Sequence, residues 1–191
     1  MNKTFKQFFY KTLIESPRNT GDFVSEYSDT PTAMIKYDDI MKDKSIKVVH
    51  TLYPDSHSVY LYEERDENDI TLYFVPKNDN FIYGYATYEV TNDGGAIMTS
   101  VYNRPMYFGL AQGVYNKYII PTYNYIMSDG NHSPDGKKFW KKIINSNLDK
   151  RVEIWDFEMN KSLMIIDDPN QIDKFYGDTF PYEKYRIKIS K

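Results

Sequence analysis

The feature that most constrains the fold is a series of three strand-like segments joined by short turns. The segments are ITLYFVPK (70–77), FIYGYATYEV (81–90) and GAIMTSVYN (95–103), and all are rich in aromatic and β-branched residues. The separators NDN and TNDGG have the composition of hairpin turns. Because a parallel neighbour needs a long crossover, strands joined this closely pair antiparallel. The sequence therefore predicts an antiparallel meander.

Two further predicted strands, SIKVVHTLY and SVYLYEE, precede this meander. The pattern changes after it. GLAQGVYNKYI has helical spacing, YNYIMSD is a short apolar strand, and SPDGKKFWKKIINSN is a helix with a serine N-cap followed by proline. The strands on either side of the first helix are therefore expected to lie parallel or nearly so. RVEIWDFE and KSLMIID then form a hairpin, and the tail ends in an edge strand.

This order predicts the α+β class, with a mixed, mostly antiparallel central sheet flanked by helices. A chain of 191 residues is most simply a single domain spanning 1–191. We divide it into an N-terminal helix and irregular segment (1–45), a core (46–166) and a C-terminal extension (167–191). Apolar residues at helix spacing place the first helix at about 3–15.

The stretch RPMYFGLAQG lies between a predicted strand and a predicted helix, and it resembles the cofactor loop of GNAT-type N-acetyltransferases. In that family a strand leads into a loop of the form Arg/Gln-x-x-Gly-x-Gly/Ala, which opens a helix. Gly109 and Ala111 match the small residues of this pattern, whereas Met106 stands where a basic or amide side chain is usual. The order of predicted elements is also similar to the acyl-CoA N-acyltransferase fold.

A second resemblance covers about 90–165 and concerns GNAT-like proteins of tailed phages. The stretch YNYIMSDGNHSPDGKKFWKKI has a strand ending in Ser-Asp, followed by a helix that opens with Ser-Pro-x-Gly and carries a tryptophan. The segment RVEIWDFE continues the similarity. The resemblance implies an acetyltransferase-like phage protein.

The resemblance implies acetyl-coenzyme A as the cofactor. Backbone N–H groups of Phe108, Gly109, Leu110 and Ala111 would hold the pyrophosphate, since the unpaired amides at a helix start favour a phosphate. The strand containing Val101 would pair with the pantetheine arm. The alternative for this stretch is a glycine-led corner, stabilised by packing alone.

Acyl transfer needs a base for the amine and a donor for the leaving thiolate. In the family the base is often a Glu on a central strand, which here points to Glu89; the alternative is an outward-facing strand residue. The usual Tyr donor is missing from its place, and Tyr115 or Tyr118 on the preceding helix could substitute. Asp129 could orient a substrate amine, or it could be a turn aspartate that bonds its own backbone.

Composition limits the other classes of site. The chain has no cysteine and three scattered histidines, so we expect no metal. A net charge of −3 gives no strong nucleic-acid signal. The helical segment 133–151 carries six basic residues. It is either a basic rim beside a coenzyme A phosphate or the solvated face of a helix. Nothing has the length and hydrophobicity of a signal peptide or membrane span. We therefore expect a cytoplasmic protein, in the host cell if it is of phage origin, or a virion component.

Two hypotheses of different classes remain open. The first is an enzyme that transfers an acetyl group from acetyl-coenzyme A to an amine. The second is a non-catalytic scaffold with the same fold, acting as a phage structural component or as an inhibitor of a host protein. The 19 tyrosines favour contact surfaces and a partner that is a host or phage protein.

Overall fold

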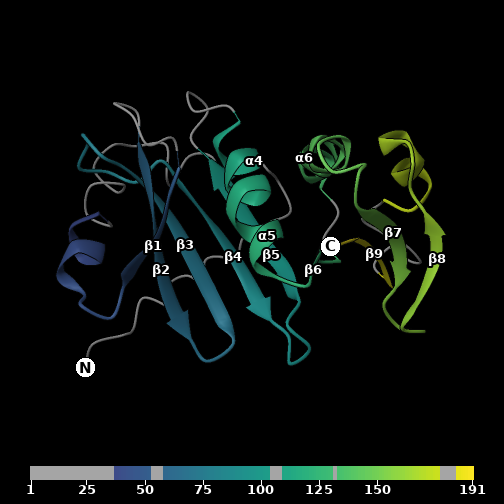
Figure 1. Ribbon diagram of the computed structural model, residues 1–191, viewed down its shortest axis with the longest axis horizontal. Helices are drawn as coiled ribbons and strands as arrows, with labels where there is room; N and C mark the ends of the chain where they lie inside the picture. The colour runs from purple at the N-terminus through teal and green to yellow at the C-terminus, as the bar shows by residue number, and fades with distance from the viewer. Residues whose placement is uncertain (1–36, 53–57, 104–108, 131–132, 177–183) are drawn as a thin grey trace.

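The computed structural model describes residues 37–52, 58–103, 109–130, 133–176 and 184–191 (Figure 1). These residues form one nine-stranded sheet with the order β1-β2-β3-β4-β5-β6-β9-β7-β8. The strands are β1 Lys47–Leu52, β2 Val59–Asp66, β3 Asp69–Pro76, β4 Gly84–Val90, β5 Ala96–Asn103, β6 Tyr125–Met127, β7 Arg151–Asp156, β8 Lys161–Ile165 and β9 Tyr185–Ser190.

The helical elements lie mainly between β5 and β7. They are α4 Leu110–Val114, the π-helix η1 Tyr115–Ile119, α5 Ile120–Thr122, α6 Pro134–Asn145 and the 3-10 helix η2 Pro169–Lys174. A further short helix occupies residues 37–42. The first helix that we expected, at about 3–15, lies outside the described residues.

The sheet is mixed and mostly antiparallel. Strands β1 to β5 form an antiparallel meander, β5 and β6 run parallel, and β6, β9, β7 and β8 pair antiparallel. The predicted α+β class, the meander and the β7–β8 hairpin are therefore confirmed. The parallel pair occurs where the chain crosses over through α4, η1 and α5, because a helix of that length can return the chain to the same end of the sheet.

Strand β9 corrects one expectation. We expected the tail to end in an edge strand, but β9 lies between β6 and β7 and pairs with both. Its residues Ile187 and Ile189 are 2% and 1% exposed, so one face of the strand is part of the core. The C-terminal segment therefore supplies an interior strand.

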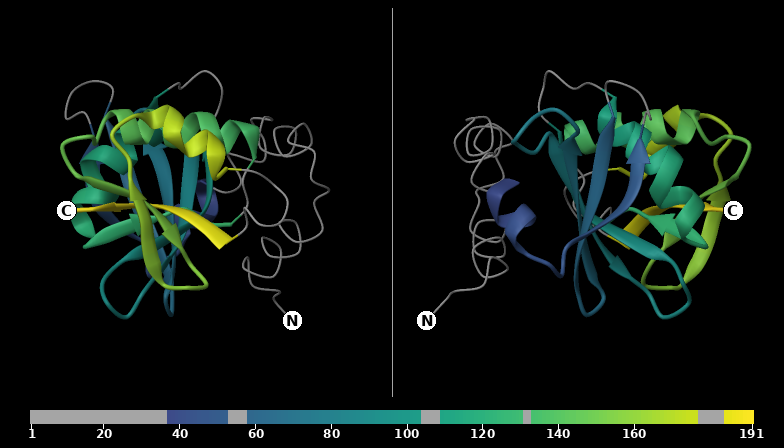
Figure 2. Two further views of the ribbon diagram at one scale, coloured as in Figure 1. Left: turned by 90° about the vertical axis from the view of Figure 1, so that its right-hand side faces the viewer. Right: turned by 60° about the vertical axis from the view of Figure 1, so that its left-hand side comes forward.

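The two faces of the sheet are covered differently. Leu72, Ala86 and Ile143 belong to the main core between the sheet and the helices α4 to α6. Residues that alternate with these along the strands, such as Tyr73 and Tyr85, pack with Ile40 of helix 37–42 in a smaller cluster. Figure 2 accordingly shows helix 37–42 on the other side of the sheet from α4 and α6.

The helix after β5 changes its hydrogen-bonding pattern in the middle. The N–H of Ile120 donates to the carbonyl of Tyr115, five residues earlier, as in a π-helix. Pro121 follows directly and has no N–H to donate, so a regular α-helical pattern cannot continue through it. The result is a continuous helical segment with Tyr115 at the start of its wider turn.

The helix predicted after YNYIMSD is confirmed as α6. The side chain of Ser133 caps it by accepting a hydrogen bond from the N–H of Gly136 at 3.0 Å, and Pro134 occupies the first turn. Trp140, Ile143 and Ile144 face the core, as the helical spacing requires.

Candidate functional site

Strands β5 and β6 diverge after a short parallel contact. They pair only at Ala96 with Ile126 and at Ile97 with Met127, although β5 continues to Asn103. Along the rest of β5, no described strand lies on the β6 side. A register shift opposite Thr87, consistent with a bulge, bends β5 in the same region. The carboxyl ends of β5 and β6 are therefore not hydrogen-bonded to each other and leave an opening between the two strands. Helix α4 begins beyond the end of β5 (Figure 1).

Gly109 is placed at the head of α4. It is the N-cap residue, with φ 85° and ψ −9°, a left-handed conformation that favours glycine. A Cβ built on Gly109 would meet nothing within 4 Å, and this glycine has no side chain to cap α4. The start of this helix therefore presents backbone N–H groups beside open space.

Three other residues predicted to bind the cofactor are described: Leu110 and Ala111, which follow Gly109, and Val101 on β5. Leu110 and Ala111 are each 7% exposed and turn their side chains into the core, so their contribution would come from their amides. Val101 lies in the part of β5 beyond the β6 contact and is partly buried against the main core. Phe108 and Met106 lie outside the described residues.

Asp129 follows β6 at the same edge of the sheet. The preceding Ser128 is fully buried: its N–H donates to the carbonyl of Ile187 at 2.9 Å, and its Oγ accepts from the N–H of Ile187 at 3.0 Å. These two bonds fix the end of β6 against β9. Asp129, which is half-buried, therefore has a defined position at the carboxyl end of the strand.

Two tyrosine hydroxyls come close enough to Asp129 to respond to its charge. Burial raises the pKa of Tyr115, and the carboxylate of Asp129 raises it further. The same two causes, in the same order, raise the pKa of Tyr176. The charge of Asp129 therefore acts on Tyr115, another predicted site residue, and on Tyr176, which sequence reasoning missed.

Tyr115 is held rigidly between helices. It is 1% exposed, and its ring packs edge-on against Phe139 at 4.8 Å and against Trp140 at 6.1 Å between centroids. The ring is therefore enclosed by residues of α6.

Tyr176 comes from the segment that we expected to be a C-terminal extension. It is 6% exposed, and its hydroxyl lies close to the start of α6, where Gly136 has no side chain. The signal in the sequence was the glycine in the first turn of a strongly predicted helix, since glycine there leaves room for a close neighbour. The sequence could not indicate which residue would use that room.

Glu89 lies apart from this cluster. It is exposed on β4, opposite Asp69 and Ile97. Its neighbour Tyr88 faces the helices, so Glu89 points to the other side of the sheet. Because β4 and β6 are two strands apart, about 10 Å separates Glu89 from the strand that carries Asp129.

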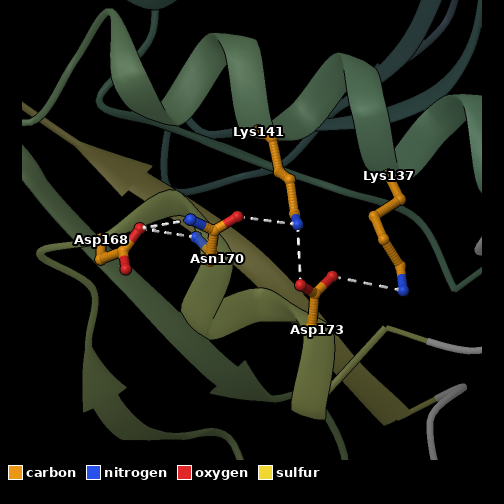
Figure 3. A network of polar contacts seen from close by, with 5 residues as sticks. All are labelled: Lys137, Lys141, Asp168, Asn170 and Asp173. Atoms are coloured by element: carbon orange, nitrogen blue, oxygen red, sulfur yellow. Dashed lines mark hydrogen bonds and ion pairs between the residues drawn. The ribbon is translucent and has the colours of Figure 1, made fainter.

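Figure 3 shows that two lysines of the basic segment tie α6 to η2. Lys141 contacts the carboxylate of Asp173 at 2.7 Å and Oδ1 of Asn170 at 3.0 Å, and Lys137 contacts Asp173 at 3.4 Å. The hydrogen bond from Lys141 is the main cause that lowers the pKa of Asp173. Asn170 is held in turn by Asp168, the N-cap of η2. These lysines are therefore partly neutralised within the protein.

Tyr118, the other tyrosine considered as a proton donor, lies three residues after Tyr115 in the same π-helix. Burial raises its pKa to about 12, and the carboxylate of Glu63 contributes next. Its ring contacts that of His50 at 5.3 Å. Tyr118 thus belongs to a polar cluster with β1 and β2, away from Gly109.

The described residues offer neither a metal site nor a membrane span. They contain no group of three or more His, Cys, Asp or Glu side chains arranged to hold a metal ion. None of the helices in this part of the chain combines the length and apolar character needed to cross a membrane.

The comparisons with known proteins found no relative. No protein-family model matches the chain, and no curated protein is significantly similar to it in sequence.

Proposed function

We propose that the protein is a GNAT-type acyltransferase that moves an acetyl group from acetyl-coenzyme A to an amine. The observation that carries this proposal is the divergence of the parallel strands β5 and β6 beside the uncapped start of α4. A strand edge without a strand neighbour offers hydrogen bonds to an extended amide-containing arm. An uncapped helix start offers N–H groups to a phosphate.

In this proposal the amides at Gly109, Leu110 and Ala111 bind the pyrophosphate, together with the amide of Phe108. The open space at Gly109 would allow the phosphate to approach the backbone closely. The pantetheine arm would extend along β5 past Val101, on the side from which β6 diverges. The thioester would then lie deep in the opening, near the point where the two strands still pair.

The transfer would form a C–N bond and break a C–S bond. The amine attacks the thioester carbonyl and loses a proton to a base, and the thiolate leaves and is protonated. Glu89 is the proposed base, and because it points to the face away from α4, it would receive the proton of the amine through water. Asp129 would orient the amine.

The proposed donors are Tyr115 and Tyr176, whose hydroxyls are subject to the charge of Asp129. Both hydroxyls are protonated at neutral pH, as in any tyrosine, and their raised pKa values favour hydrogen-bond donation over release of the proton. Tyr176 would supply the hydroxyl that is missing from the usual position in the family.

Calorimetric titration of the full chain with coenzyme A and with acetyl-coenzyme A tests the binding step. We expect binding by the wild type and its loss in Gly109→Leu, whose side chain would fill the space at the helix start. Gly94→Ala is the matched control, because Gly94 also has a positive φ, 81°, but lies in the turn at the other end of β5. It should lose stability through the same backbone strain and through a contact of its Cβ with Nδ2 of Asn124 at 2.7 Å, and it should still bind.

Release of free thiol from acetyl-coenzyme A, measured with a panel of amines, tests the chemistry. Glu89→Gln and Asp129→Asn should both slow release while leaving coenzyme A binding in place. Absence of any binding at millimolar cofactor, or equal loss in Gly94→Ala and Gly109→Leu, would contradict the proposal.

A non-catalytic scaffold of the same fold, in a phage structural protein or a host-protein inhibitor, is the second candidate. The observation that favours it is the pairing of Lys137 and Lys141 with Asp173, which occupies basic side chains that a coenzyme A phosphate would need. Binding without thiol release for any amine, or no binding at all, would support this candidate over the enzyme.

A further inference from the structure

The exposed apolar side chains of the described residues gather at one edge of the sheet. Of eight large exposed hydrophobic residues, four lie in the β7–β8 hairpin and its turn: Phe157, Met159, Leu163 and Ile165. Ile165, at 59%, and Leu163, at 40%, belong to β8, which is the last strand of the sheet. Exposed apolar residues on an edge strand mark a surface suited to pairing with another strand.

The backbone of β8 is oriented for such pairing. The N–H of Ile166 donates to the carbonyl of Val152 at 2.8 Å, so this residue faces β7. In an antiparallel ladder the neighbouring residue turns its N–H and C=O the other way. Ile165 therefore directs both groups away from β7, toward the outer edge.

We propose that β8 pairs antiparallel with β8 of a second copy of this chain, about a two-fold axis at Met164. This register places Leu163 of one copy opposite Ile165 of the other, twice. It also places Lys161 opposite Asp167, twice. Cross-strand apolar and opposite-charge pairs are the units that stabilise a sheet.

The charges of Lys161, the first residue of β8, and of Asp167, two residues beyond its last residue, select this arrangement. Lys161 and Asp167 are both exposed, and Lys161 has no ion-pair partner among the residues that the structure describes. Asp167 accepts a hydrogen bond from Nε2 of Gln171 at 2.6 Å, which holds its carboxylate at the end of the strand. Parallel pairing of two β8 strands would set like charges against each other at both ends. Antiparallel pairing sets opposite charges together.

The shape of β8 favours a second copy over an unrelated strand. Trp155 faces Ser162 and Ile154 faces Met164, so Leu163 is an extra residue in a bulge. A bulge increases the local twist and discourages pairing with a flat strand. A two-fold axis brings together two edges with the same twist. The contact is self-complementary and therefore closes as a dimer.

The other edge of the sheet provides the comparison. Strand β1 also exposes apolar residues, Val48 and Val49. If β1 of one copy paired with β8 of a second copy, the pair would still have one free β1 edge and one free β8 edge. Further copies could add at these edges, so the assembly would grow instead of stopping at a dimer. The proposal therefore predicts a dimer as the limit of association.

Sedimentation equilibrium and light scattering of the full chain across a range of concentrations test the proposal. We expect a monomer–dimer equilibrium with no larger species. Ile165→Asp should abolish the dimer, because it places a carboxylate opposite Leu163 of the other copy. Val48→Asp, which makes the same kind of change at the β1 edge, should leave the dimer intact. Circular dichroism would verify that both variants are folded.

A charge exchange tests the register. Lys161→Asp and Asp167→Lys should each weaken association roughly tenfold, since each creates two like-charge pairs per dimer. The double variant Lys161→Asp/Asp167→Lys should regain most of the lost affinity. A monomer at every concentration, larger assemblies, a dimer that survives Ile165→Asp, or no recovery in the double variant would each overturn the proposal.

Discussion

The hydroxyl oxygen of Tyr176 lies 2.7 Å from the position that a Cβ would occupy on Gly136. The same position would be 3.0 Å from Oγ of Ser133, the residue that caps α6. Glycine in this first turn therefore allows a tyrosine from a segment near the C-terminus to reach the start of the helix. This contact places a hydroxyl beside Asp129, at the edge of the sheet where the proposed acyl transfer would occur.

Gly136→Ala should lower the free energy of unfolding by about 1 kcal/mol, because the added methyl group would displace the buried Tyr176 ring. Helix propensity alone predicts the opposite sign, a gain of about 1 kcal/mol. In a Tyr176→Phe background the hydroxyl is absent, so the same substitution should become neutral or stabilising. Urea unfolding of the four proteins in this cycle measures the coupling. A stabilising Gly136→Ala in the wild-type background would contradict the contact.

Gly95, which directly precedes β5, and Gly109, at the head of α4, should differ in their tolerance of alanine. Gly95→Ala would place its Cβ 2.1 Å from the ring of Tyr125, whose hydroxyl is held by Asp93 at 2.9 Å, so we expect a loss of about 3 kcal/mol. Gly109→Ala meets no atom within 4 Å and should cost only the backbone strain of its positive φ, about 1 kcal/mol. Thermal unfolding of both variants checks this order. A larger loss for Gly109→Ala would mean that the head of α4 is closely packed.

Local patterns in the sequence predicted much of this fold. The turn between β4 and β5 and the capped start of α6 are encoded by neighbouring residues, and the structure confirms them. The connection between β3 and β4 is longer than the predicted NDN turn, because β4 begins at Gly84. The place of β9 was predicted wrongly, because alternation in YRIKIS identifies a strand with one covered face but not its neighbours. Its insertion between β6 and β7 depends on contacts with residues far away in sequence.

The candidate site divides in the same way. Gly109 could be identified because its conformation is a local requirement at the start of a helix. The influence of Asp129 on Tyr115 depends on how the helix after β5 packs relative to the end of β6, and that on Tyr176 depends on a segment far away in sequence. The side of the sheet on which Glu89 lies depends on which alternate residues the helices cover, and the sequence of β4 does not specify this.

Acid should destabilise the protein in part through Glu153. This buried glutamate on β7 accepts a hydrogen bond from Nη2 of Arg151 at 2.7 Å, and that bond is the main cause that lowers its pKa. A lowered folded-state pKa means that the unfolded state binds the proton more readily. The stabilisation is therefore present above the ordinary glutamate pKa and is lost as the pH falls through the lowered value. Glu153→Gln should cost about 1 kcal/mol at pH 7, since the solvent-exposed arginine weakens the pair.

The measurement is urea unfolding between pH 7 and pH 3 for both proteins. The difference in free energy of unfolding between wild type and Glu153→Gln should shrink toward acidic pH. A difference that does not change with pH would show that the glutamate contributes through packing alone. Glu158→Gln, on the exposed turn between β7 and β8, is the control and should show no such change.

Lys188 should stabilise the outer face of the C-terminal half of the sheet. Its Nζ lies 3.8 Å from the ring centroid of Trp155 and 4.3 Å from that of Tyr125, so one cation links β7, β9 and β6. Lys188→Met keeps the length of the side chain and removes the charge, and we expect a loss of about 1 kcal/mol. Lys188→Arg should recover most of it, whereas Lys142→Met, on the exposed face of α6, should change stability little.

Because Lys188 also lowers the pKa of Glu153, Lys188→Met should move the acid transition of Glu153 to higher pH. Equal stability of Lys188→Met and wild type, with an unmoved acid transition, would show that the two rings hold this edge of the sheet without the cation.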